Sequence, residues 1–217
     1  LLEREKMGQA LTRPELSVLV AYGKMVLKEQ LVSDEISNDE FHAQQLVNYF
    51  PSELRRNYLS QMDTHPLRAE IIATCLANQM VNEMGCNFVT RMQEETGATV
   101  VDIANAYSAA REIFELGGIM KQVRSFDNTA TTIAQYDLMY SIRRILRRLS
   151  RWLLRNRSNK STVNELVALY HDDVQAVMKD LDNLLVKDEV QEHNDLADLW
   201  IEQGIERPVA NYVSRLS

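Results

Sequence analysis

Apolar side chains along the 217-residue chain recur at spacings of three and four residues, which is the period of an amphipathic α-helix. No stretch alternates with the period of two that a half-buried β-strand requires. The clearest helical repeats cover residues 13–31, 64–85, 102–117, 128–156 and 162–184. The pattern predicts an all-α protein, a multi-helix array or bundle of roughly eight to ten helices with no β-sheet.

Helix starts are predicted by capping boxes, in which a Ser or Thr side chain and an acid three residues later satisfy backbone amides of the first turn. The boxes are Thr12 with Glu15, Ser37 with Glu40, Thr99 with Asp102, and Thr162 with Glu165. Thr64, followed by Pro66, predicts one further start.

Glycines predict where helices end, because Gly adopts the left-handed conformation of a helix C-terminus without steric cost. We expect ends at Gly85, at Gly97 and at the pair Gly117 and Gly118. Spacing places Leu67, Ile71, Thr74, Cys75, Asn78 and Val81 on the buried face of the helix before Gly85.

The polar stretch RNRSNKST, residues 155–162, is the best linker candidate, since it interrupts the periodic pattern with small and charged residues. It divides the chain into a main helical array, 1–157, and an acidic helical C-terminal subdomain, 162–217. The chain begins with Leu1, and neither end resembles a natural boundary. We therefore expect a piece of a longer protein with a truncated C-terminal subdomain.

Composition supports a folded helical protein: 45% of residues are hydrophobic, with only seven Gly and four Pro. No apolar run has the length of a membrane span, and the N-terminus lacks a signal-peptide pattern. Cys75 and Cys86 are too few and too far apart for a zinc or CxxC arrangement. These features predict a cytoplasmic protein without a membrane partner.

Arginines dominate the helix predicted for residues 128–156. At about 100° per residue, six of them share an arc of roughly 140° opposite an apolar face. The basic positions are Arg143, Arg144, Arg147, Arg148, Arg151 and Arg155, with Arg157 just beyond. Residues 162–217 carry twelve acidic and four basic residues, a net charge of −8. Because the two segments are complementary and the whole chain has a net charge of −7, internal or interdomain pairing is favoured over nucleic-acid binding.

Motifs for catalysis are absent: the chain has no GxGxxG, P-loop, HExxH or GxSxG sequence, and its four histidines are scattered. We therefore assign no catalytic, cofactor-binding or metal residue. Arg13 and Arg68 fall at predicted helix starts and Glu94 and Glu95 at a predicted helix end, each of the wrong sign for the helix dipole. We interpret these four residues, together with Arg143, Arg147, Arg151 and Arg155, as candidate interdomain or partner contacts.

Six strings in fixed order resemble the region that follows the catalytic domain in the large bacterial NAD-specific glutamate dehydrogenases. They are LTRPELSVLVAYGK (11–24), YFP (49–51), HPLRAEIIATCLANQMVNEMG (65–85), FVTRMQEETGA (88–98), DIANAYSAAREIF (102–114) and RWLLRN (151–156). Residues 157–217 resemble the same helical tail only loosely.

The resemblance implies a parent enzyme that converts L-glutamate, NAD and water to 2-oxoglutarate, ammonia and NADH. It implies that the NAD site and the catalytic residues lie outside this segment. For this segment it implies the parent's catalytic domain as partner, and a homo-oligomer. We favour scaffolding between domains or subunits as its role; regulation through a bound amino-acid effector is the second role. A non-enzyme alternative is a free-standing helical module that binds an anionic partner through the Arg143 to Arg155 face.

Overall fold

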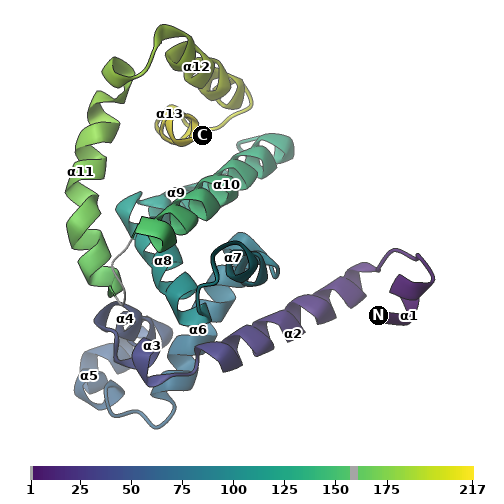
Figure 1. Ribbon diagram of the computed structural model, residues 1–217, viewed down its shortest axis with the longest axis vertical. Helices are drawn as coiled ribbons and strands as arrows, with labels where there is room; N and C mark the ends of the chain where they lie inside the picture. The colour runs from purple at the N-terminus through teal and green to yellow at the C-terminus, as the bar shows by residue number, and fades with distance from the viewer. Residues whose placement is uncertain (1, 157–160) are drawn as a thin grey trace. The chain divides into compact units, whose positions relative to one another are not determined.

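A computed structural model describes residues 2–156 and 161–217, and every regular element in those ranges is an α-helix (Figure 1). The all-α prediction is therefore confirmed. The described residues form 13 helices, more than predicted, and two of them, α1 (Leu2–Lys6) and α3 (Asp34–Asn38), have only five residues. No helix in the described ranges is both long and apolar enough to cross a bilayer. The chain divides into two compact units, Leu1–Ala104 and Asn105–Ser217.

Unit 1 is built around α6, on which α2, α3, α4 and α7 pack (Figure 1). Besides α1 and α3, its helices are α2 (Arg13–Leu31), α4 (Glu40–Tyr49), α5 (Ser52–Met62), α6 (Arg68–Met84), α7 (Phe88–Thr96) and the first turn of α8 (Val100–Ile113). The central position of α6 follows from its small residues: Ala73 and Ala77 are fully buried and let neighbouring helices approach closely.

The buried face of α6 overlaps the predicted one only in part. The buried apolar residues are Ile72, Ala73, Leu76, Ala77, Met80 and Val81. Of the predicted members, Val81 is buried, Ile71, Cys75 and Asn78 are half-buried, and Leu67 and Thr74 are exposed. Several helices cover α6, and the direction from which they pack selects the buried face. Apolar spacing alone could not distinguish between two adjacent stripes on a helix with so many apolar residues.

Two of the predicted capping boxes, at Thr99 and Thr162, have both of their hydrogen bonds. At Thr12 the carboxylate of Glu15 accepts from the Thr12 amide at 2.8 Å and from the Thr12 hydroxyl at 2.7 Å. The box at Ser37 is wrong because Ser37 lies inside α3, and the side chain of Asp39 instead accepts from the amide of His42 at 3.1 Å to cap α4. Thr64 does not cap α6 either, since its hydroxyl donates to the carbonyl of Gln61.

Unit 2 contains the rest of α8 and five further helices (Figure 1). They are α9 (Leu116–Ser125), α10 (Thr132–Asn156), α11 (Val163–Leu184), α12 (Lys187–Glu202) and α13 (Arg207–Leu216). α10 packs on α9 and α13, and α12 packs along α13. The core is formed by apolar side chains of α10, including Leu138, Ile142, Ile145 and Leu146, and by Trp200 of α12.

The boundary between the two compact units falls within α8. Helices from both sides of the polar stretch near residue 157 belong to unit 2, where α10 packs on α13. Residues 157–160, including Arg157, lie outside the described residues. The division into 1–157 and 162–217 stays a prediction.

Gly117 and Gly118 do not end α8 as predicted. The helix stops at Ile113, and Glu115, with a left-handed φ of 49°, turns the chain so that both glycines enter the first turn of α9. A Cβ atom on Gly117 would lie 2.4 Å from Nη1 of Arg111, so the glycine leaves room for that guanidinium group. Gly117 thus permits close packing at the α8–α9 junction, whereas a Cβ atom on Gly118 would meet nothing within 4 Å.

Candidate functional site

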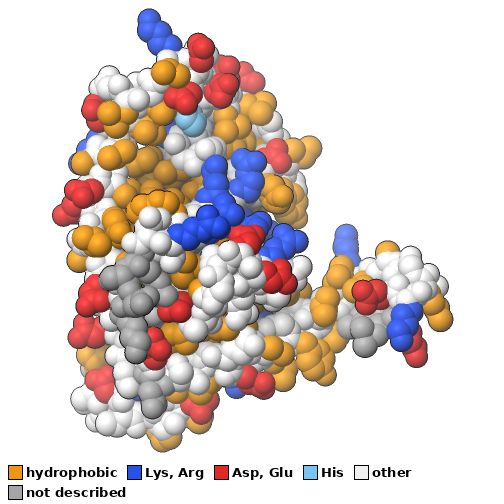
Figure 2. Space-filling view, viewed as in Figure 1, with side chains coloured by type: hydrophobic (Ala, Val, Ile, Leu, Met, Phe, Trp, Pro, Cys, Tyr) orange, Lys and Arg blue, Asp and Glu red, His pale blue; other side chains and the backbone are white. Residues whose placement is uncertain are grey.

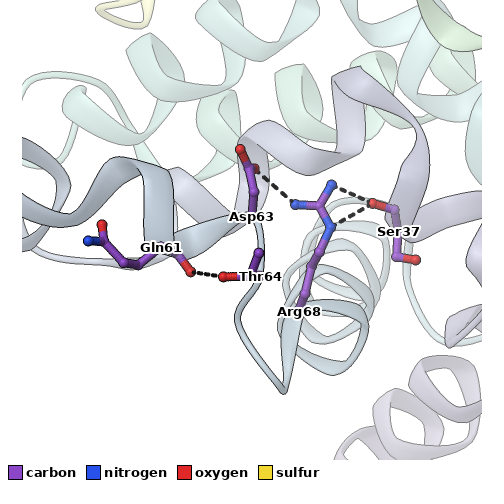
Figure 3. Close-up of polar contacts among 5 residues, drawn as sticks. All are labelled: Ser37, Gln61, Asp63, Thr64 and Arg68. Carbon is purple, nitrogen blue, oxygen red and sulfur yellow. Dashed lines mark hydrogen bonds and ion pairs between the residues drawn. The ribbon is translucent and has the colours of Figure 1, made fainter.

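Arg68 connects three segments of unit 1 (Figure 3). Its Nε and Nη2 atoms donate to the carbonyl of Ser37 in α3 at 3.1 and 2.8 Å, and Nη1 lies 3.3 Å from Oδ1 of Asp63, the residue after α5. The Arg68 side chain is only 20% exposed. The guanidinium satisfies a carbonyl in the last turn of α3, where helices lack internal donors. Within this unit Arg68 is thus an internal connection between helices.

Arg13, Glu94 and Glu95 are placed differently from Arg68. Arg13 begins α2 and is exposed, with no ion pair to any described residue. Glu94 and Glu95 lie in the last turns of α7 and are exposed. Their role as interdomain or partner contacts stays a prediction.

The arginines of α10 fall into two groups. Arg143, Arg147 and Arg151 are half-buried, and each has an interaction partner. A second set is exposed on the same face: Arg144, Arg148 and Arg155, joined by Tyr136 and Tyr140, which are 69% and 64% exposed. Nη2 of Arg148 donates to the carbonyl of Leu216 in α13 at 3.3 Å. Figure 2 shows Lys and Arg side chains gathered over α10.

The largest apolar exposure in unit 1 is on α2, and sequence reasoning missed it. Seven large apolar side chains of this helix are 38% to 62% exposed: Leu16, Val18, Leu19, Val20, Tyr22, Met25 and Val26. At about 100° per residue they cover an arc of about 220°. Figure 2 shows hydrophobic side chains along the length of α2. The signal was present in the sequence, because an apolar arc this wide is typical of a helix covered on several sides.

An apolar groove of about 400 Å³ adjoins this surface within unit 1. α2 lines one side of it with Leu19, Tyr22 and Val26, and Val89 of α7 lies on the other. Gly23 makes the approach close, because a Cβ atom there would lie 3.4 Å from Sγ of Cys86. The groove extends the exposed apolar surface of α2 toward α7.

A polar cavity of about 630 Å³ lies in unit 2, where α8, α9, α11 and α13 meet. Its charged and polar lining consists mainly of Arg111, Glu112, Glu115, Lys121, His171 and Tyr212. Nη1 of Arg111 lies 3.2 Å from Oε1 of Glu112, and Nε2 of His171 lies 3.8 Å from Oε1 of Glu115. Sequence reasoning did not find this cavity, because its residues come from segments up to about a hundred positions apart.

Two side chains from distant helices hold the end of α8 beside this cavity. The hydroxyl of Tyr212 donates to the carbonyl of Phe114 at 2.8 Å, and the amide of Gln175 in α11 donates to the carbonyl of Ile113 at 3.1 Å. Burial, and then the negative charge of Glu115, raise the pKa of Tyr212 to about 12. The tyrosine is therefore a neutral donor at physiological pH.

The described residues contain no arrangement that suggests covalent or metal chemistry. No group of three or more His, Cys, Asp or Glu side chains among them is placed to hold a metal ion. Cys75 and Cys86 are free, and burial raises the pKa of the Cys75 thiol, which disfavours the reactive thiolate. The features available for function are the apolar surface of α2, the basic face of α10 and the polar cavity.

Comparison with known proteins identifies related sequences. The family model described as "Glutamate dehydrogenase, C-terminal" matches residues 8–217. The NAD-specific glutamate dehydrogenase of Halomonas elongata is 42% identical over 162 residues, which cover 75% of this chain and 10% of that protein. The protein of the same name from Pseudomonas aeruginosa is 36% identical over 85% of this chain and 11% of its own length. The one from Mycobacterium tuberculosis is 31% identical over 97% of this chain and 13% of its own length.

The chain thus spans roughly a tenth of the length of the relatives it matches. The family model covers nearly all of the chain, and the six motifs that suggested the resemblance lie within the matched range. The chain belongs to the family of glutamate dehydrogenase C-terminal regions.

Proposed function

We propose that this chain is a non-catalytic helical segment of an NAD-dependent glutamate dehydrogenase and acts as a scaffold between domains or subunits of that enzyme. The parent reaction would convert L-glutamate, NAD and water to 2-oxoglutarate, ammonia and NADH, with NAD bound outside this segment. The names of the three relatives support the reaction, and the small share of their length that the chain covers supports a location of the chemistry elsewhere.

The observation that carries the scaffolding role is the exposed apolar surface of α2. Seven large apolar side chains on one helix exceed the scattered apolar exposure of an ordinary surface, and such patches are typical of interfaces. We propose that the remainder of the glutamate dehydrogenase chain covers this surface. About nine-tenths of each relative's length lies outside the match, and the groove toward α7 continues the apolar surface of α2.

Substitutions on α2 test this role in the intact enzyme. Val18→Lys with Tyr22→Lys places charges on the exposed apolar arc, and Ser17→Lys places one on the polar side of the same helix near Lys24 and Lys28. The paired substitution is expected to weaken assembly, measured by light scattering, and to lower the melting temperature. Ser17→Lys should leave both at wild-type values. Unchanged assembly and melting in the paired variant would contradict the scaffold.

The non-catalytic part of the proposal has its own test. The 217-residue chain, incubated with L-glutamate and NAD, is expected to produce no NADH by absorbance. NADH production above the protein-free rate would refute the non-catalytic part of the proposal. The scaffolding role would still be tested separately by the α2 variants. We further propose a cytoplasmic location, supported by two free thiols in a chain that forms no disulfide between them.

A second candidate function is a helical module that binds an anionic partner through α10. The exposed Arg144, Arg148 and Arg155 beside Tyr136 and Tyr140 support it, because Arg and Tyr are enriched at binding surfaces. Arg144→Glu with Arg155→Glu tests it without disturbing the half-buried arginines. Salt-dependent binding to an acidic protein, DNA or anionic vesicles that disappears in this variant would support the module, and no binding by the wild type would exclude it.

A further inference from the structure

The groove between α2 and α7 in unit 1 is lined by apolar and neutral polar side chains. Leu19, Tyr22 and Val26 line it from α2, and Val89 lines it from α7. The neutral polar residues beside them are Gln30, Asn87, Thr90 and Gln93. Among the described residues that line the groove, none carries a charge. The groove therefore favours an uncharged apolar surface over an ionic ligand, because a charge taken out of water there would meet no ionic partner.

The spacing of the α2 side chains indicates the shape of the occupant. Leu19, Tyr22 and Val26 are three and four residues apart, so they form a ridge along α2, and each is about half exposed. Such a ridge fits between the side chains of a second helix. An extended segment would fit less well, because its own backbone N–H and C=O groups would lie against α2, whose backbone groups are already bonded within the helix. We therefore expect a helix in this position.

The chain that leads into α2 lies close to the same surface. Nε of Arg4 in α1 is 2.8 Å from Oε1 of Glu15 in the first turn of α2, and Figure 1 shows α1 next to the start of α2. The matching family model describes a C-terminal region, and about nine-tenths of each relative's length lies outside the match. In the parent enzyme proposed above, the residues before Leu1 would therefore approach the exposed apolar arc of α2.

We propose that an amphipathic helix, formed by residues that precede Leu1 in the parent enzyme, lies along α2 and places apolar side chains in the groove toward α7. This helix-in-groove arrangement uses anchors at spacings of three and four residues on one helix face. The 19 residues of α2 span about 28 Å, so a partner helix of about the same length covers it. The inference rests on the proposed function, because it names the part of the parent enzyme that covers the α2 surface.

Photo-crosslinking in the intact enzyme tests which segment lies in the groove. Thr90 is exposed and lines the groove, so p-benzoylphenylalanine in place of Thr90 would contact the occupant. We expect irradiation to link this position to a peptide from within about 60 residues before Leu1, because connections between packed helices are short. Mass spectrometry identifies the peptide. The link should lie within one subunit and leave the subunit mass on a denaturing gel unchanged.

The matched control places p-benzoylphenylalanine at Arg91, which is exposed next to Thr90 but does not line the groove. It should not link to the same peptide. Capture of a different segment from the Thr90 position would overturn the proposal. So would capture of a second copy, which doubles the mass on the gel, or no capture at all.

Thiol labelling of the intact enzyme gives a second test. Cys86 lines the groove, so a helix seated there should slow its reaction with N-ethylmaleimide, followed by mass spectrometry. Val26→Asp places a charge in the groove and should raise the labelling rate of Cys86 about tenfold or more, because the charge disfavours the covered state. Met25→Asp is the matched control: Met25 is 56% exposed, close to the 52% of Val26, but it does not line the groove.

Cys75 in α6 does not line the groove, and an unchanged labelling rate there shows that unit 1 stays folded in the Val26 variant. Equal Cys86 rates in the Val26→Asp and Met25→Asp variants would overturn the proposal. If the Val26 variant fails to fold, the crosslink from the Thr90 position still decides, since that substitution lies on an exposed residue.

Failure of this inference differs from failure of the scaffolding role. Normal assembly of the variant with Val18→Lys and Tyr22→Lys would contradict scaffolding. If that variant loses assembly while the Thr90 position captures no residue before Leu1, scaffolding holds and only the assignment of the covering helix is wrong.

Discussion

The hydroxyl of Tyr212 in α13 donates to the backbone carbonyl of Phe114, 98 residues earlier, at 2.8 Å. Phe114 directly follows α8, where backbone carbonyls have no partner within the helix. Gln175 in α11 donates to the neighbouring carbonyl of Ile113. The end of α8 is therefore held by side chains of two helices, α11 and α13, that are far from it in the sequence. These bonds also shape the wall of the polar cavity.

Tyr212→Phe should lower the free energy of unfolding by about 1 kcal/mol near pH 8, the usual contribution of one hydrogen bond. Chemical denaturation measures this loss. Tyr136→Phe is the matched control, because Tyr136 is 69% exposed and should lose almost nothing. Equal stability of the Tyr212 and Tyr136 variants would show that the Phe114 carbonyl finds water instead.

The same tyrosine predicts a pH dependence at alkaline pH. Its pKa is raised from 10.0 to about 12 in the folded chain, so the unfolded chain loses this proton first. The stability that Tyr212 contributes is therefore complete below pH 10 and is lost as the pH rises toward 12. The free energy of unfolding should fall more steeply over this interval in the wild type than in Tyr212→Phe, measured by denaturant titrations at successive pH values. Parallel curves would contradict the shifted pKa.

Arg68→Ala should destabilise unit 1 by about 2 kcal/mol, because it removes a charged donor from the Ser37 carbonyl and from Asp63. Arg13→Ala is the matched control, because Arg13 also lies in the first turn of a helix with a proline close by in the sequence. Arg13 is exposed, and it forms no ion pair with a described residue. Thermal unfolding followed by circular dichroism compares the two. A loss in the Arg13 variant as large as that in the Arg68 variant would mean that both sites act through the helix start itself.

Gly204→Ala should be strongly destabilising in unit 2. Gly204 has a φ of 96°, and a Cβ atom there would lie 2.4 Å from the carbonyl oxygen of Thr129. Gly97→Ala, at a φ of 69° in open space, carries the left-handed strain without the clash. We expect a cost of about 1 kcal/mol at Gly97 and clearly more at Gly204, measured by denaturant unfolding. Similar costs would indicate that the backbone near Thr129 moves away.

Ala73→Leu should cost about 1–3 kcal/mol, since Ala73 is fully buried where helices approach α6 and extra methyl groups have no room. The neighbouring Thr74→Leu should change stability by less than about 0.5 kcal/mol, because Thr74 is exposed. Denaturant unfolding of the two variants compares adjacent stripes of one helix. A larger loss of stability in Thr74→Leu than in Ala73→Leu would instead support the buried face that was predicted from apolar spacing.

Local sequence signals predicted the helices well where the signal and the structure share the same few residues. Thr12 with Glu15, Thr99 with Asp102 and Thr162 with Glu165 make their capping bonds within one turn, so nothing distant can change them. The predictions for Ser37 and Gly117 were wrong because the structure at these residues depends on more than their own helical turn. Ser37 lies inside the short helix α3, and Gly117 lies in the first turn of α9, against the guanidinium of Arg111.

The candidate sites were harder to predict. Spacing correctly placed the arginines of α10 on one face, but it could not show that Arg143, Arg147 and Arg151 are half-buried while Arg144 and Arg155 are exposed. The sequence by itself determined the all-α class, most helix starts and the family, because these depend on local bonding and on the order of motifs. Only the tertiary structure decided which face of α6 is buried, that a wide apolar arc of α2 stays exposed, and that Arg111, Glu115, His171 and Tyr212 share one cavity. Those outcomes depend on how helices pack against one another, which helical periodicity does not specify.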